Sequence, residues 1–220
     1  MNSLIKYSIV LIILQFSLNS CGLIVYKVYF KAKIIPKYTS KKKINKFFKK
    51  HAATQDNLVF LSDSSFVQKI EEPGWAFNSW RLYNSNGERL RRGSDSLACF
   101  GSDKTFLKNF SMENAIIDSS KNLSLNYFTN QKFYNPSLGS QTELDTVSEY
   151  DYTLILYWSK WRGRFSEDIL DLEKVFVLNN PELRIRVIKV NMDFRDEMEN
   201  TWVNKFDLWT KEVKRRKEKK

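Results

Sequence analysis

The chain has 220 residues, 42% of them hydrophobic, which is enough for one globular core and excludes wholesale disorder. Its formal charge of +11 lies in the flanks, because residues 1–50 carry +11 and residues 211–220 carry +5, which leaves −5 on residues 51–210. An acidic body argues against a nucleic-acid-binding domain, and a single histidine, His51, leaves Ser-His-Asp triads and histidine-rich metal sites almost nothing to be built from.

The first 20 residues are typical of an export signal, with Lys6 ahead of an apolar run over residues 7–16 and small polar residues after it. The stretch LNSC at residues 18–21 resembles the lipobox of bacterial lipoproteins, in which the cysteine is lipidated and becomes the first mature residue. The resemblance implies a signal peptide over residues 1–20 and acyl chains such as palmitate on Cys21. It also implies a lipid-anchored protein of the bacterial cell membrane or outer membrane that faces the periplasm.

Two other interpretations of this segment remain open. Residues 8–30 reach the ~20 residues that a bilayer-spanning helix needs, although Gln15 and Lys27 interrupt the apolar run. The positive-inside rule would then put the body in the cytoplasm, because nine lysines follow within residues 31–50 and only Lys6 precedes the span. An ordinary cleaved signal peptide is the third interpretation.

Residues 21–55 are predicted to form a lipid-anchored basic tether whose lysines meet anionic headgroups. Ile44, Phe47 and Phe48 lie at helical spacing after Ser40, a candidate helix N-cap. Two interpretations follow from this pattern. The segment is either a basic amphipathic helix that lies on lipid or a solvated tether whose few apolar residues dock on the body.

Residues 56–210 are predicted to form a single α/β domain, followed by a basic tail over residues 211–220. Residues 57–61 have strand character, and residues 62–65 can open a short helix. A β-hairpin is expected over residues 80–90, because its Asn-Gly step favours the positive φ angles of a tight turn.

Residues 101–145 are rich in serine, asparagine and threonine, and they predict a short helix near residues 103–110 and a loop at residues 135–146. They form either a surface excursion or part of a mixed sheet. If Cys21 is acylated, only Cys99 remains, and its apolar neighbours indicate a buried small side chain. A local carboxylate cluster could serve an enzyme of another class, although its polar surroundings favour a solvated loop. The cluster is Glu143, Asp145, Glu149 and Asp151.

A β-α-β unit gives the strongest fold signal. Residues 152–158 are a continuous apolar, β-prone run of the kind buried on both faces of a sheet. Ser166 can cap a helix that ends at residues 179–181, and residues 183–193 form a second strand, so the two strands should be parallel. A final amphipathic helix is expected over residues 198–213.

Residues 153–193 resemble the first half of a thioredoxin core. That family has a hydrophobic strand, a Trp-x-x-Trp segment, a tight active-site turn, a helix and a strand that ends in V-N-x-D, and residues 158–161 and 190–193 match its two short motifs. The resemblance implies a thioredoxin-like core over residues 151–200, with an N-terminal β-hairpin region. The core should be incomplete or modified, because the family's cis-proline has no counterpart after Pro181 and the family's final hairpin and helix are missing.

The Cys-x-x-Cys turn of the family is absent here. Its two cysteine positions are Arg162 and Phe165, which excludes disulfide exchange by the family's route, while Gly163 stands where a sharp turn would need it. The degenerate active-site turn is therefore Trp161, Arg162, Gly163, Arg164 and Phe165. No catalytic residue, cofactor or metal is predicted.

Two guanidinium groups at this helix start, Arg162 and Arg164, would suit a phosphate or carboxylate ligand. A structural pairing with Glu167, Asp168 or Asp171 is the favoured interpretation. The two tryptophans of the Trp-x-x-Trp segment are expected in the core rather than in an exposed protein-binding patch.

The sequence thus predicts a membrane-anchored, non-redox thioredoxin-like lipoprotein of the bacterial cell envelope, with a binding or structural role. Its expected partners are the membrane and an envelope protein, and nucleic acid is not favoured. The alternative is a single-span membrane protein with a cytoplasmic domain and basic flanks that contact lipid or nucleic acid.

Overall fold

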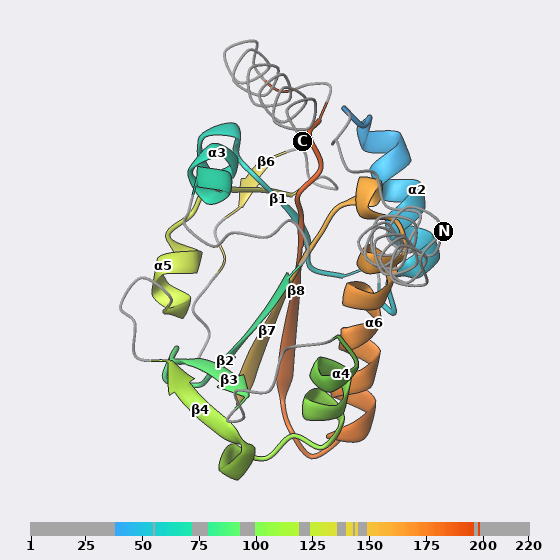
Figure 1. Ribbon diagram of the computed structural model, residues 1–220. Coiled ribbons are helices and arrows are strands. Elements are labelled where there is room, and N and C mark those ends of the chain that lie inside the picture. Colours follow the sequence, from blue (N-terminus) through green and yellow to red (C-terminus); the bar gives the residue numbers. More distant parts are fainter. Residues whose placement is uncertain are drawn as a thin grey trace, which may run out of the picture.

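The computed structural model of the chain describes residues 38–54, 56–71, 79–92, 100–118, 124–135, 140–142, 144, 149–195 and 198. These residues form an eight-stranded mixed sheet with helices on both faces (Figure 1). The α/β class predicted from the sequence is therefore confirmed. The predicted signal peptide over residues 1–20, Cys21, Cys99 and the basic tail over residues 211–220 lie outside the described residues, as does the predicted final helix apart from Met198.

Helices and strands follow one another along the described chain, with two 3-10 helices, η2 and η4, between them. The first half contains α2 (Lys41–His51), β1 (Leu58–Leu61), α3 (Asp63–Glu71), β2 (Ser79–Asn84), β3 (Arg89–Arg92) and α4 (Phe100–Lys108). The second half contains η2 (Met112–Asn114), β4 (Ala115–Asp118), α5 (Leu125–Thr129), β5 (Phe133–Asn135), β6 (Ser140–Thr142), β7 (Tyr152–Trp158), η4 (Lys160–Arg162), α6 (Arg164–Asn179) and β8 (Ile185–Asn191).

Parallel strands form the centre of the sheet, whose order is β4-β3-β2-β7-β8-β1-β5-β6. β8 pairs in parallel with β7 on one side and with β1 on the other. The other neighbouring pairs are antiparallel. The parallel pairing of β7 and β8, with α6 between them in the chain, confirms the predicted β-α-β unit.

β7 is buried on both faces because its side chains alternate between two hydrophobic cores. Leu154, Leu156 and Trp158 join the core formed with α2, α4 and α6. Ile155 and Tyr157 join the core formed with α3 and α5 on the opposite face (Figure 1). This double burial explains why the strand is continuously apolar instead of alternating with polar residues.

The predicted hairpin is formed by β2 and β3, which pair antiparallel with Leu82 opposite Leu90. The turn closes through a 2.9 Å hydrogen bond from the Gly87 backbone N–H to the Asn84 carbonyl. Within this turn only Gly87 has a positive φ, of 75°. The turn is therefore wider than a two-residue turn with positive φ at both central positions.

Some predicted boundaries were wrong. α6 begins at Arg164 with Gly163 at its N-cap, so Ser166 lies inside the helix and does not cap it. The predicted start of α2 is confirmed, because Ser40 is at its N-cap, although the side chain makes no capping hydrogen bond. The loop predicted at residues 135–146 contains β6, which pairs with β5. Three strands between residues 101 and 145 thus belong to the mixed sheet.

α2 belongs to the folded body. Ile44 and Phe48 are buried in the core that contains Trp158. The rings of Phe47 and Phe48 stack on Trp158 with centroid distances of 5.6 Å each. The apolar stripe of this helix is therefore covered by protein, and the interpretation in which that stripe lies on lipid is wrong. The folded body extends upstream of residue 56.

Shortening the buried side chain of Ile44 tests this packing. Ile44→Val is expected to lower the free energy of unfolding by about 1 kcal/mol, because one methyl group is lost from a closed core. Urea titration followed by tryptophan fluorescence measures the change. Lys50→Ala, at an exposed position of the same helix, should change it by less than about 0.5 kcal/mol. Equal values for the two variants would contradict the docking of α2.

Candidate functional site

The candidate functional site is the turn between β7 and α6, for which the sequence predicted a degenerate active-site turn. η4 closes through a 3.0 Å hydrogen bond from the Arg162 N–H to the Ser159 carbonyl. The Gly163 N–H donates to the Lys160 carbonyl at 3.2 Å. The turn lies beside α2 at the end of the sheet where β7 ends (Figure 1). Local hydrogen bonds thus fix its backbone tightly.

Gly163 has φ 59° and ψ −128°, a combination that residues with a Cβ rarely adopt. Gly163→Ala is therefore expected to lower the free energy of unfolding by roughly 2 kcal/mol, measured by urea titration. Arg164→Ala is the matched control, since Arg164 is the exposed next residue and its loss should cost less than about 0.5 kcal/mol. Similar losses in both variants would show that alanine adopts this backbone conformation without strain.

Asp193 holds the turn from the end of β8. Its Oδ2 accepts hydrogen bonds from the Lys160 backbone N–H at 2.7 Å and from the Asn191 side-chain amide at 2.8 Å. The Trp161 backbone N–H also donates to this carboxyl group. The Asn191 side-chain oxygen accepts from the Asp193 N–H at 3.1 Å. The V-N-x-D motif therefore acts as a clamp on the turn.

The Asp193 carboxyl group is fully buried, and burial raises its pKa to about 6 from the ordinary 3.8. Hydrogen bonds from Asn191, Lys160 and Trp161 lower the pKa but do not outweigh burial. Oδ1 is buried and has no hydrogen-bond partner. Oδ2 thus accepts the hydrogen bonds that hold the turn, and the unpaired Oδ1 makes ionisation of the carboxyl group unfavourable.

Arg162 and Phe165, at the two positions that the thioredoxin resemblance would assign to cysteines, lie against each other. The Arg162 guanidinium carbon lies 5.2 Å from the centre of the Phe165 ring and 5.3 Å from that of Trp161. Burial lowers the pKa of Arg162. Arg164, next in the chain after Gly163, is exposed. The turn therefore presents a cationic and aromatic surface.

The carboxylates of the first turns of α6 bind cations from other elements. Lys104 of α4 lies 2.7 Å from an Asp171 oxygen and 3.8 Å from an Asp168 oxygen. Burial raises the pKa of Asp168, and the charges of Lys104 and Arg164 oppose that effect. The pairing expected from the sequence omitted Lys104, because nothing local shows that α4 packs on α6.

Both tryptophans of the Trp-x-x-Trp segment are in the core, as expected, since Trp158 is 0% and Trp161 5% exposed. α2 covers Trp158 and extends over the start of α6, where His51 Nε2 lies 3.6 Å from a Glu167 oxygen. Burial lowers the pKa of His51, and the nearby Glu167 opposes this. A binding patch formed by these two tryptophans is therefore excluded.

A second buried polar cluster was not predicted from the sequence. Lys189 of β8 is 0% exposed, and its Nζ lies 2.7 Å from an oxygen of Glu173, which is 5% exposed. The same Nζ donates to the Thr54 hydroxyl at 2.6 Å, and that hydroxyl donates to Glu173 at 2.7 Å. Carbonyl oxygens of Thr54 and Asp56 accept further bonds from Nζ. The cluster ties the segment after α2 to the sheet.

The carboxylate cluster proposed for enzyme chemistry is only partly within the described residues, because Glu143 and Asp145 lie outside them. Asp151 pairs with Arg184, whose guanidinium donates to Oδ1 at 2.9 Å. These hydrogen bonds lower the pKa of Asp151. Glu149 is exposed. Of the described members, Asp151 thus has a structural ion pair and Glu149 is solvated.

Within the described ranges, no group of three or more His, Cys, Asp or Glu side chains is placed to hold a metal ion. No helix in that part of the chain combines the length and the hydropathy that a membrane span requires. Comparison with protein-family models, curated proteins and solved structures finds no match to the chain.

Proposed function

We propose that the chain is a membrane-anchored, thioredoxin-like lipoprotein of the bacterial cell envelope that binds a partner protein and does not exchange disulfides. The proposal rests mainly on the residues that form the turn between β7 and α6. Asp193 holds the turn and Gly163 forms its bend, whereas the positions that the resemblance assigns to the two thiols hold Arg162 and Phe165. Thiol-disulfide exchange requires a thiolate at such a position. A rigid turn without a nucleophile supports recognition by its cationic and aromatic side chains.

The arrangement of the strands supports the thioredoxin-like part of the proposal. β7 leads through the turn into α6 and then into the parallel β8, as in the first half of that core. The family also has a hairpin, which follows the β-α-β unit in the chain. Here a hairpin pairs antiparallel with β7 but comes from the upstream segment, β2 and β3. The proposed core is therefore a rearranged one.

The lipoprotein part rests on the LNSC stretch and the apolar run before it. Growth with a clickable palmitate tests it, by comparing the wild-type chain with Cys21→Ser. We expect label only on the wild-type chain and a longer precursor in the variant. Absence of label from both would contradict the proposal, and it would favour the alternative of a spanning helix with a cytoplasmic domain.

The binding part is tested by a photo-crosslinking amino acid at Arg164, beside the stacked side chains of the turn. Lys174, exposed further along α6, is the control position. We expect a discrete crosslinked partner from Arg164 only. The same adduct from both positions would argue against recognition by the turn. Disulfide reductase activity that Cys99→Ser abolishes would contradict the non-redox assignment.

A further inference from the structure

The side of α2 that faces away from the core carries five exposed lysines. They are Lys42, Lys43, Lys46, Lys49 and Lys50. None of the ion pairs in the described part of the chain involves them. We call these five residues the lysine face. Because the apolar stripe of α2 is covered by the domain, the lysine face is presented by a rigid body and not by a flexible tether.

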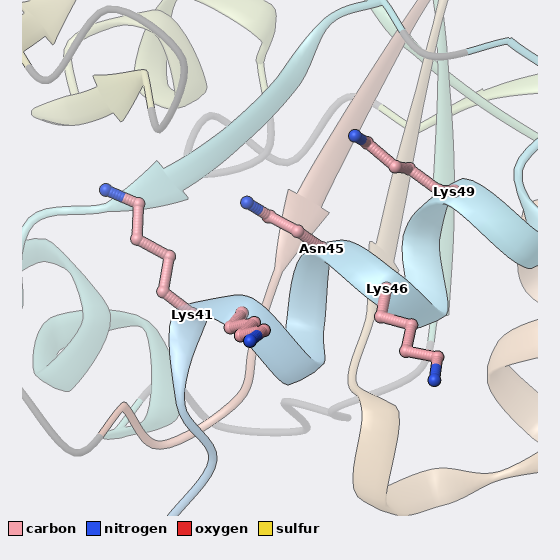
Figure 2. A pocket seen from close by; sticks show the side chains of 5 residues that line it. Lys41, Asn45, Lys46 and Lys49 are labelled. Carbon is pink, nitrogen blue, oxygen red and sulfur yellow. The ribbon is translucent and has the colours of Figure 1, made fainter.

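An open hollow of about 540 Å³ lies along one side of this helix. Figure 2 shows Lys41, Asn45 and Lys49 projecting in a row from one side of the helix, and Lys46 pointing away from them. The residues that line the hollow are four lysines and Asn45, with no carboxylate among them. Lys41 also donates a 3.0 Å hydrogen bond to the Tyr134 hydroxyl. Every charged side chain that lines the hollow is therefore a lysine.

The placement of these charges is unfavourable for α2 on its own. The first turn holds three lysines and no acidic residue, so positive charge lies at the positive end of the helix dipole. Lys42 and Lys46, and then Lys46 and Lys50, are four residues apart on the helix surface, where like charges repel. A negatively charged surface against this side would relieve both effects.

We propose that the lysine face docks the domain on an anionic membrane surface. This inference deepens the proposed function and rests on its membrane anchor. Lys41 follows Cys21 by 20 residues, a stretch that can span at most about 70 Å, so the domain stays near the bilayer. Lysine ammonium groups are mobile point charges that suit a layer of headgroups without fixed geometry. The attraction is purely electrostatic, because the apolar stripe is already buried, and salt should weaken it.

Docking through the lysine face would also orient the functional turn. α2 stacks on Trp158, the last residue of β7, and its final residue, His51, lies against Glu167 in the first turn of α6. The turn would therefore lie close to the headgroups. A partner that reaches it would have to be at the membrane surface itself.

Single-hit acetylation of lysines, read by mass spectrometry, tests the docking. The full chain is reconstituted in vesicles of phosphatidylcholine alone and of phosphatidylcholine mixed with phosphatidylglycerol. We expect acetylation of Lys42, Lys46 and Lys49 to be slower on the anionic vesicles by about fivefold, the effect of one lysine's attraction to such a surface. Lys108 and Lys174, exposed on α4 and α6, should react equally on both. High salt should abolish the difference.

A triple variant, Lys42→Gln, Lys46→Gln and Lys49→Gln, should lose the anionic protection of Lys43 and Lys50. The control variant, Lys108→Gln with Lys174→Gln, should keep it. Equal acetylation on both kinds of vesicle would overturn the docking. Stronger protection by duplex DNA than by anionic vesicles at equal phosphate would overturn the lipid assignment. If neutral vesicles fail to retain the chain, the proposed membrane anchor is wrong. The docking is then tested by comparing the acetylation of the lysine face on anionic vesicles with its acetylation in the free protein.

Discussion

Replacing Lys189 by methionine is expected to lower the free energy of unfolding by about 3 to 5 kcal/mol, the largest effect predicted for a single substitution in this chain. Lys189 donates to Glu173 at 2.7 Å and to the Thr54 hydroxyl at 2.6 Å, and the lysine is fully buried. Methionine fills much of the same space but leaves the buried Glu173 carboxylate without its positive partner. Urea titration of the two proteins measures the difference.

The double variant Lys189→Met with Glu173→Leu separates loss of the pair from loss of packing. Removing both charges should recover at least half of the stability lost in Lys189→Met, because no buried ion remains unpaired. Lys174→Met, at an exposed position next to Glu173, should stay within about 0.5 kcal/mol of the wild type. If the double variant is as unstable as the sum of the two single ones, the pair itself contributes little.

The central elements could be predicted from local sequence. The strand at residues 152–158 and the apolar periodicity of the following helix each depend on residues adjacent in the chain. The hairpin around Gly87 could be predicted for the same reason, since a glycine at positive φ is a local requirement. What the sequence could not show is the order of the strands, in which β2 comes to lie beside β7 across a long connection.

The packing of α2 could be predicted even less well from the sequence. Its helical spacing was visible, but a lysine-rich amphipathic helix can bury its stripe in lipid or in protein, and the pattern is the same for both. The decision depends on Trp158, more than a hundred residues away, whose ring supplies the surface on which Phe47 and Phe48 stack.

The buried pair had a signal that sequence reasoning overlooked. Lys189 interrupts an apolar strand between Ile188 and Val190, and Glu173 lies on the apolar side of α6 next to Leu172. Two opposite charges at positions predicted to be buried are expected to compensate each other. For the turn, the motif positions located the site, but the stacking of Arg162 on Phe165 depends on rotamers that no pattern gives.

The free energy of unfolding is expected to fall by about 2 kcal/mol between pH 4 and pH 7 because of Asp193 alone. Burial raises the pKa of this carboxyl to about 6 in the folded protein, whereas the unfolded chain has the ordinary value of 3.8. The folded state therefore binds the proton more tightly. The stabilisation is complete only below the unfolded pKa of 3.8 and is lost as the pH rises through about 6. Above about pH 6, the ionised carboxylate stays buried and desolvated, which destabilises the folded state.

Other carboxyl groups titrate in the same range, so the test is a difference between the wild type and Asp193→Asn. Asparagine keeps a side-chain oxygen that can accept the Lys160 N–H, and it cannot ionise. The stability of the wild type relative to the variant should decline from pH 4 to pH 7. The effect of Asp151, whose pKa is lowered by Arg184, cancels in this comparison. A difference that stays constant with pH would contradict the raised pKa of Asp193. It would mean that solvent reaches the Oδ1 atom and that the carboxyl group is not buried against the turn.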